Sequence, residues 1–553
     1  MPINSLPRRT AALVAALALV IPAAACNSGD SPGGNSSNGS QGTDAAVYNP
    51  VSSSGTPPGG PLIPTDSEEA GRKTIIWLIF DGLVRVDTEN KVVNEVAESI
   101  TTDDAKTWTI KLKEGQKFAN SEPVTADSFI NAWTWGANID NAQIATGDLA
   151  VIKGYDKLHP SEAGASPTAT EFEGLTKVDD LTFTVELTDV YSSFTNLLTS
   201  TVFSPLPQAF FDDYDAWVKN PIGNGPYQLQ KEVDESDGAY LEVNPNYTGT
   251  RAPENTGVYI RFYTNPDAIY QDVLADNLDI GSASGAGLLT AAQDFGDRFI
   301  TGPGGPNQTL TFPLYDEFWG SADGLKVRQA ISLAIDREEI IAQVFNGLAA
   351  PAREFTQEGL HGWDGNLPGS EILDFDPDKA KQLLEEAGGY PRDELPIYYN
   401  ADGAHKEWVE AVANQLRANL GLNAVPAPIT TFPEFLEKRD LEEFTGPWRA
   451  SEIPFNPGLD DILRNVYSRA GSSSSGSGFE SEEFEELLAA GRAQTSIDEA
   501  NAYFNEAQEV LLRELPAIPL WYTYRTQIHS TKVSNVQTAA FGSTTYLIHK
   551  EDS

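Results

Sequence analysis

The chain has 553 residues, of which 40% are hydrophobic and 10% aromatic. This length exceeds what one hydrophobic core usually organises, and the apolar content is sufficient for two cores, so we expect two packed units. The formal net charge of −43 at pH 7 excludes nucleic acid as a partner, because phosphate groups would be repelled. An acidic surface of this kind favours solubility in a crowded cell envelope.

The first 25 residues have the pattern of a secretion signal. Arg8 and Arg9 precede an apolar run from Ala11 to Ile21, and small residues follow up to Cys26. This run of 11 residues is shorter than the ~20 that a membrane-spanning helix needs. Small residues directly before a cysteine resemble the lipobox of bacterial lipoproteins, in which that cysteine receives lipid and becomes the new amino terminus.

Cys26 is the one cysteine in the chain, which excludes an intrachain disulfide, a cysteine-based metal site and a cysteine nucleophile. A lipid-bearing thioether explains the single cysteine, although the lipobox usually has Leu at the position of Ala23. We expect residues 1–25 to be a lipoprotein signal peptide and residues 26–61, rich in Gly, Ser, Asn and Pro, to be a flexible tether. The protein is then extracytoplasmic and lipid-anchored to the outer face of the cell membrane. The alternative is an ordinary cleaved signal with an incidental cysteine.

Beyond the tether the sequence mixes strand and helix patterns. Apolar and polar residues alternate in Trp108–Gly115 and in Tyr259–Thr264, which predicts half-buried strands. Helices are predicted after the cap at Asp376, over Lys406–Leu420, and after a capping box that begins at Ser496. The two kinds of element alternate without a repeat period, so the predicted fold class is mixed α/β.

The motifs of common catalytic and metal sites are absent from the sequence. It has no G-x-x-x-x-G-K-[ST] phosphate loop, no complete G-x-G-x-x-G and no G-x-S-x-G nucleophile elbow. The five histidines are far apart in the sequence: His159, His361, His405, His529 and His549. We therefore expect no metal, no cofactor and no catalysis; an envelope hydrolase is the enzymatic alternative.

Six segments, taken in order, resemble the peptide-type solute-binding proteins of bacterial ABC importers, a family that includes dipeptide- and oligopeptide-binding lipoproteins. Most of these segments encode scaffold. They are IIWLIFDGLVRVD (Ile75–Asp87), WTIKLKEGQKFANSEPVTADSFINAW (Trp108–Trp133), PIGNGPYQL (Pro221–Leu229), LEVNPNYTG (Leu241–Gly249), VLADNLDIG (Val273–Gly281) and LKVRQAISLAIDREEIIAQVFNG (Leu325–Gly347).

The resemblance implies a two-lobe periplasmic-binding-protein-like (Venus flytrap) fold with an extra subdomain in the first lobe. Lobe I would comprise residues 62–305 plus 517–553, and lobe II residues 306–516. The apolar runs Leu310–Tyr315 and Ile518–Tyr524 are the predicted hinge crossings. A ligand would bind between the lobes, and closure would bury it.

The same resemblance points to a pocket loop. Relatives carry a segment of the form R-A-G-W-x-x-D-Y-P, whose acidic residue meets the free amino end of a bound peptide. Aligned on Arg449 and Pro457, this sequence has Glu452 at the Trp position, Phe455 at the Asp position and Asn456 at the Tyr position. These three residues are candidate ligand contacts, and the missing acid weakens the assignment of a peptide.

Other candidates are less specific. The alternative is a loop register that differs by one or two residues; Asp460 and Asp461 are nearby acids, although both fit more naturally on the following helical turn. Trp448, Tyr399 and Trp521 are aromatic candidates for the pocket, although such residues at strand ends more often belong to the core.

The predicted function is that of an extracytoplasmic substrate-binding receptor of an ABC importer. It would bind a short peptide or peptide-like solute and deliver it to a permease and ATPase complex, and we expect a monomer. One alternative keeps the fold but binds a non-peptide or amino-blocked solute, such as a glycoside or a chelate. Another is a surface sensor or adhesin that is not coupled to transport.

Overall fold

The computed structural model describes residues 48–551 except residues 68, 163, 284, 470 and 472–474. The predictions for the signal peptide, for Cys26 and for most of the tether fall on residues 1–47 and lie outside the described residues.

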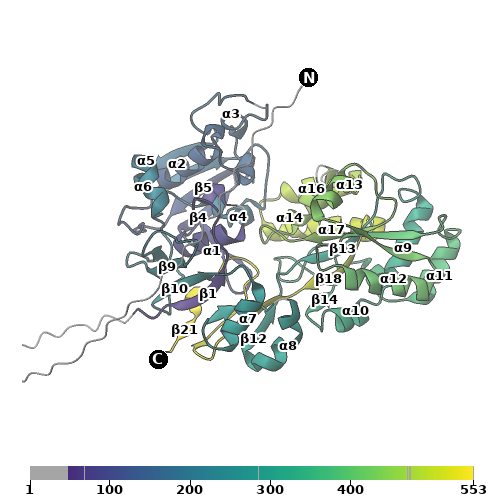
Figure 1. Cartoon of the computed structure of the whole chain (residues 1–553). Helices are drawn as coiled ribbons and strands as arrows, with labels where there is room; N and C mark the ends of the chain where they lie inside the picture. Colours follow the sequence, from purple (N-terminus) through teal and green to yellow (C-terminus); the bar gives the residue numbers. More distant parts are fainter. Residues whose placement is uncertain are drawn as a thin grey trace, which may run out of the picture. The chain divides into compact units, whose positions relative to one another are not determined.

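The described chain forms two lobes (Figure 1), and each lobe is built around one large hydrophobic core. One core contains buried side chains from Leu62 to Ile260 together with Tyr546, and the other contains those from Leu310 to Trp521. We call the part of the chain around the first core the first lobe, and the part around the second core the second lobe.

The first lobe contains two larger sheets and eight helices in its described part. Its seven-stranded sheet has the order β12 (Phe299–Gly302), β19 (Arg525–His529), β11 (Ile280–Gly281), β1 (Val51–Gly55), β10 (Gly257–Phe262), β9 (Gly238–Val243) and β8 (Tyr227–Leu229). The four-stranded sheet has the order β4 (Ala97–Thr102), β5 (Thr107–Leu112), β7 (Thr182–Glu186) and β6 (Leu175–Asp179). Two short hairpin-like pairs are β2 (Val84–Val86) with β3 (Val92–Asn94), and β20 (Val533–Ser534) with β21 (His549–Lys550). The helices are α1 (Ala70–Ile79), α2 (Ala126–Ala137), α3 (Tyr155–Leu158), α4 (Phe194–Leu197), α5 (Gln208–Asp212), α6 (Tyr214–Lys219), α7 (Pro266–Leu274) and α8 (Gly285–Phe295).

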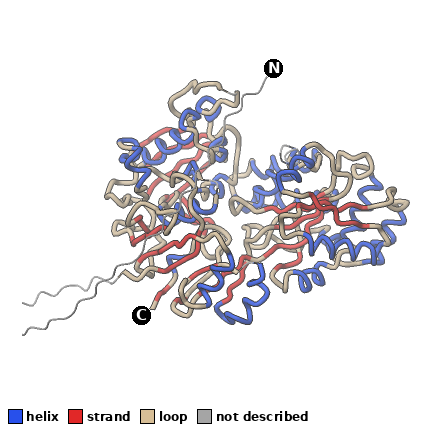
Figure 2. The backbone as a smooth tube through the Cα atoms, in the orientation of Figure 1, coloured by secondary structure: helices blue, strands red, loops and turns tan. Residues whose placement is uncertain are grey.

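The second lobe is a six-stranded mixed sheet with helices on both of its faces (Figure 2). The strand order is β14 (Ala349–Pro351), β18 (Ala517–Thr523), β13 (Asn307–Thr311), β17 (Trp448–Glu452), β15 (Leu395–Asn400) and β16 (Ala424–Ile429). The helices are α9 (Ala322–Leu333), α10 (Arg337–Val344), α11 (Pro377–Glu386), α12 (Lys406–Leu420), α13 (Phe432–Asp440), α14 (Leu459–Ile462), α16 (Glu482–Arg492) and α17 (Ile497–Glu514).

Local sequence patterns explain several of these elements. In β5 the side chains of Trp108, Ile110 and Leu112 are buried while their neighbours are exposed, as the alternation predicts. Helix α12 has the predicted bounds and ends where Gly421 adopts φ +68°, a conformation that favours glycine. Helix α17 begins after Ser496 as expected, but the Ser496 side chain makes no capping hydrogen bond, so the predicted capping box is wrong.

The chain crosses between the lobes twice: one crossing differs from the predicted hinge, and the other falls on the last residue of the predicted run Ile518–Tyr524. The first crossing lies between β12 and β13, and the second is at Tyr524, between β18 and β19. Leu310–Tyr315 and Ile518–Tyr524 were attractive hinge candidates because they are apolar. Leu310 and Ile518 instead pair with each other inside the second-lobe sheet, which explains their burial. The boundary of the second lobe therefore moves from residue 516 to about Thr523.

The predicted end of the tether at residue 61 is also corrected. Residues Val51–Gly55 form strand β1, which pairs in parallel with β10 near the middle of the seven-stranded sheet. Val51 is completely buried, and the backbone of this polar VSSSG segment gains hydrogen bonds in the sheet that compensate for its low hydrophobicity.

One buried carboxylate connects β1 to the end of the chain. Oδ2 of Asp279, next to β11, accepts hydrogen bonds from the backbone N–H and the hydroxyl of Ser52, both at 2.8 Å. The same oxygen lies 2.7 Å from Nζ of Lys550, and Oδ1 accepts from the Ser530 hydroxyl at 3.1 Å. Asp279 therefore joins four segments that are distant in sequence.

Replacing Asp279 with Ala should lower the free energy of unfolding by about 3–5 kcal/mol, because it leaves a largely buried ammonium without its counter-ion. The Lys550 side chain is only 16% exposed. Chemical denaturation of wild type and variant measures the change. Glu89→Ala, which breaks a surface pair whose side chains are 63% and 72% exposed, is the control and should change stability by no more than about 0.5 kcal/mol. Equal effects of the two substitutions would contradict the role of Asp279.

Candidate functional site

The described chain contains a cavity of about 510 Å³ that is lined mainly by the first lobe. Phe455 is its one lining residue from the second lobe. The first-lobe wall comes from the α1–β2 segment, the turns around residues 145–148 and 199–204, Arg251, and the carboxyl-terminal segment 539–546. This cavity is the candidate ligand site, since ligand sites are concave and combine apolar walls with a few polar groups.

Two glycines allow the chain to approach the end of α1 closely. A Cβ atom on Gly223 would lie 1.8 Å from the carbonyl oxygen of Ile79, and one on Gly225 would lie 2.6 Å from the Ile79 carbonyl carbon. The backbone N–H of Gly225 donates to the Ile79 carbonyl at 2.8 Å. The PIGNGPYQL segment therefore acts as scaffold, and it positions the residues that follow α1 on the cavity wall.

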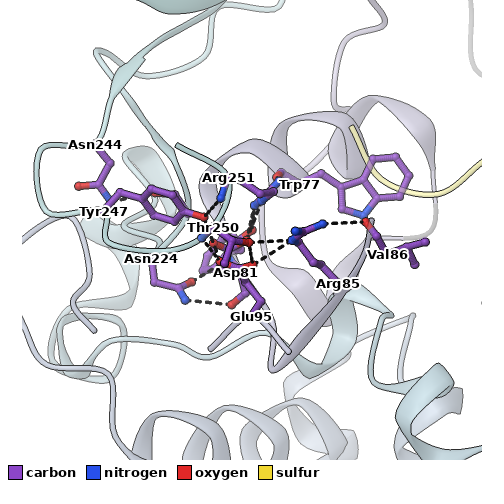
Figure 3. A network of polar contacts seen from close by, with 12 residues as sticks. Trp77, Asp81, Arg85, Val86, Glu95, Asn224, Asn244, Tyr247, Thr250 and Arg251 are labelled. Atoms are coloured by element: carbon purple, nitrogen blue, oxygen red, sulfur yellow. Dashed lines mark hydrogen bonds and ion pairs between the residues drawn. The ribbon is translucent and has the colours of Figure 1, made fainter. Parts of the chain in front are cut away.

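A buried ion pair fixes the same part of the wall (Figure 3). The guanidinium of Arg251 donates to Oδ1 of Asp81, at 2.9 Å from Nε, and also to the carbonyls of Trp77 at 2.6 Å and Phe80 at 2.8 Å. Asn224 exchanges two hydrogen bonds with the Asp81 backbone, at 3.1 and 2.9 Å. Burial raises the pKa of Asp81, and the Arg251 charge opposes this shift. Both members of the pair line the cavity.

A second carboxylate extends this network. Glu95, which is almost fully buried, accepts hydrogen bonds from Tyr247 Oη at 3.1 Å and from the Thr250 backbone at 2.7 Å, and it pairs with Arg85 Nε at 3.0 Å (Figure 3). Burial alone would raise the pKa of Glu95, but hydrogen bonds from Thr250 and the nearby arginines outweigh it and lower the pKa. The buried carboxylate of Glu95 therefore holds Arg85, which lines the cavity, in position.

Asp148 is a further acid of the cavity lining. It lies in a short 3₁₀ helix whose buried Leu149 packs in the first-lobe core. Burial raises the pKa of Asp148, whereas the Ser200 hydroxyl, Arg464 and Lys73 lower it. Neither Asp148 nor Lys73 forms a salt bridge with any residue that the structure describes, and both line the cavity.

The second-lobe loop presents Phe455 to this cavity. The Phe455 side chain is 74% exposed, which is unusual for an aromatic residue inside a folded lobe. Its backbone N–H donates to Oδ2 of Asp461 at 2.7 Å, and the side chains of Asn456 and Asn465 donate to Oδ1 at 2.9 and 3.1 Å. Burial raises the pKa of Asp461 to about 7. Asp461 therefore holds the loop in place through these hydrogen bonds. Asn456 is 2% exposed and does not line the cavity.

The three aromatic candidates are core residues. Trp448 is 1% exposed and packs against Phe444, and Tyr399 is 4% exposed in the second core. Trp521 is completely buried between Phe345 and Trp408, with ring centroids 5.1 and 5.4 Å away. None of the three lines the cavity, so their predicted ligand contacts are replaced by packing roles.

A second charged group of interest is Arg449 in β17, whose guanidinium reaches Asn400 at the end of β15. The Arg449 guanidinium is buried, donates to Oδ1 of Asn400 at 2.8 Å from Nε, and lies 4.9 and 5.2 Å from the ring centroids of Phe432 and Phe435. Among the described residues it makes no salt bridge; Asp402 and Glu452 are its nearest acids. Burial raises the pKa of Glu452 and lowers that of Arg449.

The lobes touch near the cavity through the segment before α4. The backbone N–H and the hydroxyl of Ser192 donate to the carbonyls of Arg492 and Gly491 at the end of α16, both at 2.9 Å. The Tyr191 ring lies 5.8 and 5.1 Å from the guanidinium carbons of Arg464 and Arg492. Backbone carbonyls at a helix end lack helical partners, so Ser192 caps a second-lobe helix from the first lobe.

Most of the cavity wall could not be identified from sequence. The segment Ile75–Asp87 was recognised as scaffold, and it supplies Trp77, Asp81 and Arg85 to the wall. Asp148 and the carboxyl-terminal residues such as Phe541 carried no signal, because their proximity depends on the tertiary fold.

In the part of the chain that the structure describes, no helix combines the length and apolar character needed to cross a membrane. The same residues contain no group of three or more His, Cys, Asp or Glu side chains that could hold a metal ion.

Solved structures establish the fold. The structure of the periplasmic murein tripeptide binding protein MppA, in its unliganded open form, matches with a TM-score of 0.79 at 22% identity, covering 91% of this chain and 98% of that chain. The Haemophilus influenzae OppA complex with RPPGFSPFR matches with a TM-score of 0.65 at 20% identity, covering 91% and 99%. The predicted mixed α/β fold of the two-lobe type found in periplasmic binding proteins is confirmed.

Residues 91–467 match the family described as bacterial extracellular solute-binding proteins, family 5 Middle, and the chain belongs to this family. The oligopeptide-binding protein OppA of Bacillus subtilis (strain 168) is 23% identical over 493 residues, which cover 86% of this chain and 87% of the relative. The periplasmic murein peptide-binding protein MppA of Escherichia coli (strain K12) is 24% identical over 500 residues, which cover 86% and 88%. These relatives are named as binding proteins and not as enzymes.

The environment of His405 predicts a pH effect on stability. Trp408 Nε1 donates to His405 Nδ1 at 3.3 Å, so this ring nitrogen must be unprotonated. Burial lowers the pKa of His405 from 6.5 to about 4, and Arg449 shifts it in the same direction. Between pH 4 and pH 6.5, His405 therefore binds a proton more readily in the unfolded chain than in the folded chain.

Stability from His405 should be fully present above pH 6.5 and lost as the pH falls through about 4. His405→Gln removes this titration, so wild type should lose about 1–2 kcal/mol more than the variant between pH 7 and pH 4, after allowance for partial solvent screening. Denaturant titrations at both pH values measure the difference. Parallel losses in the two proteins would contradict the assignment.

Proposed function

We propose that the chain is the extracytoplasmic receptor of an ABC importer and that it binds a short peptide or peptide-like solute between its lobes. Family membership supports the receptor role, and the names of the relatives indicate the class of solute. The bound solute would pass to a permease and ATPase complex, and the receptor would act as a monomer without a cofactor.

The single observation that carries the peptide proposal is a set of charged side chains of both signs that make no direct salt bridge, although Lys73 and Arg464 are close enough to Asp148 to lower its pKa. Lys73 and Asp148 on the cavity wall and Arg449 in the second lobe form no salt bridge with any described residue. Partly buried charges without partners are costly in a finished structure, and a ligand that carries both signs of charge would compensate for them. A free peptide has an ammonium at one end and a carboxylate at the other.

Phe455 supports a second candidate ligand. An aromatic ring at the position where relatives carry an acid favours an amino-blocked peptide or another uncharged solute, because the ring offers apolar contact and at most a cation–π interaction of roughly 0.5–2 kcal/mol. Glu452 and Asn456 stay predicted contacts of the closed, ligand-bound state.

The proposal predicts that the purified protein retains peptides. The full chain would be mixed with a pool of free tripeptides, separated from unbound material and denatured, and the released compounds identified by mass spectrometry. Tripeptides should be enriched, and X-ray solution scattering should show a smaller radius of gyration in the loaded protein because closure buries the ligand. Enrichment of glycosides or chelates from an extract, with no retained peptide, would refute the peptide assignment.

The lipid anchor is proposed on the position of Cys26 after a run of small residues. Cys26→Ala should move the protein from the detergent phase to the aqueous phase in a phase-partition assay, because the variant cannot carry a thioether-linked lipid. Mass spectrometry of the amino terminus is the independent readout. A wild-type protein that is aqueous and has an unmodified terminus would contradict the anchor.

A further inference from the structure

The acids that line the cavity differ in the hydrogen bonds and ion pairs that their carboxylate oxygens already make. Asp81 is held by Arg251. Asp87 accepts the backbone N–H groups of Glu89 and Lys91 at 2.8 and 2.9 Å, and so holds the β2–β3 turn. Asp148 is the third acid of the lining, and among the described residues it has neither a salt bridge nor a backbone N–H donor.

The position of Asp148 makes it suitable for contact with a ligand. It lies on a rigid element, because Leu149 is fully buried and the carbonyl of Thr65 accepts the backbone N–H of Ala145 at 2.9 Å. A rigid carboxylate needs little reordering when a ligand arrives, which favours affinity. The Ser200 hydroxyl, which also lines the cavity, and the charges of Arg464 and Lys73 oppose the rise in the pKa of Asp148 that burial causes, so Asp148 has positive neighbours but no direct ion pair with a described residue.

The acids of the second-lobe loop are less suitable. Both oxygens of Asp461 accept hydrogen bonds within the loop and α14 region. Asp460 is 1% exposed, and Arg464 and Arg492 are its nearest positive charges. Glu452 does not line the cavity, and Arg439 and Arg449 offset its charge.

An aromatic ring completes the arrangement. Phe455 lines the same cavity as Asp148 and is 74% exposed, so its ring is available to a ligand. A carboxylate combined with an aromatic face is a favourable environment for an organic ammonium group, because both attract positive charge.

We propose that Asp148 of the first lobe is the residue that receives the cationic group of the ligand, with Phe455 of the second lobe closing over it. This inference rests on the proposed function and deepens it: the ligand is bound with its free ammonium toward the first lobe. The acid that the family resemblance implies in the second-lobe loop, where this sequence has Phe455, is replaced by an acid from the other lobe. The burial that raises the pKa of Asp148 also strengthens its attraction for a cation, since little water screens the pair.

The test compares a pool of free tripeptides with the same pool after amino-terminal acetylation, using retention and mass spectrometry followed by calorimetry on the best binder. Asp148→Asn keeps the shape of the side chain and removes its charge, so it should weaken binding of the free peptide by about 30-fold or more. Binding of the acetylated peptide, which is weak in wild type, should not fall further.

Two matched variants separate the contact from general electrostatics. Asp87→Asn removes an equal charge from the same lining and should change affinity less than about threefold, because its carboxylate serves a turn. Glu452→Gln tests the rival acid and should also have a small effect. Thermal unfolding of each variant identifies any loss of folding that would mimic a loss of binding.

Each outcome is decisive. Loss of free-peptide binding in Asp148→Asn alone supports the proposal. Equal losses in Asp148→Asn and Asp87→Asn, a loss confined to Glu452→Gln, or equal wild-type affinity for free and acetylated peptides would overturn the role of Asp148 while leaving the receptor function intact. Retention of neither pool by wild type would refute the proposed peptide ligand, and the inference would fall with it.

Discussion

The buried ion pair between Asp81 and Arg251 is the constraint on which the ligand cavity depends. A guanidinium in a low-dielectric interior costs several kcal/mol unless its N–H groups are satisfied and its charge is paired. Arg251 meets both conditions only where α1 ends, because its partners there are Asp81 and the carbonyls of Trp77 and Phe80. If the chain after α1 moved, the charge of Arg251 would lose these partners and stay unpaired in an apolar environment. This part of the wall is therefore preorganised before any ligand binds.

The two lobes contribute to the cavity in different ways. The first lobe supplies a wall whose charged groups are held by networks behind it, as Glu95 holds Arg85. The second lobe supplies one exposed ring on a loop, and that loop is held mainly by the carboxylate of Asp461. A rigid wall and a loop with few supports are consistent with a receptor in which one lobe selects the ligand and the other closes over it.

Sequence patterns predicted the scaffold better than the site. Strand β5 and helix α12 follow from local periodicity and glycine placement. Segments such as PIGNGPYQL, which occur in the expected order along the chain, indicated the family. Such patterns report what each segment buries. They could not show that Trp521 is a core residue and not a pocket residue, because an aromatic side chain at a strand end suits both roles.

The errors at the segment boundaries have physical causes as well. The VSSSG segment of β1 is polar and resembles a linker, and its place in the sheet depends on a carboxylate more than 220 residues away in the sequence, at Asp279. Asp148 could not be selected from 80 acidic residues, since its lack of a partner is a property of the folded chain. The hinge candidates were chosen for their apolar character, which in this fold marks the interior of the second-lobe sheet.

The contacts that Asp279 makes with Ser52 and Lys550 have a mechanical consequence. The side-chain amide of Asn49 donates to the Glu551 carbonyl at 3.3 Å, and Lys550 Nζ donates to the Pro50 carbonyl at 2.6 Å, so the described chain starts and finishes at one point of the first lobe. A pull applied between these two ends would be borne by β1, β21 and the carboxylate that joins them. None of that load would pass through the two crossings between the lobes. A rotation of the second lobe about these crossings would therefore leave the contacts between the two ends unloaded.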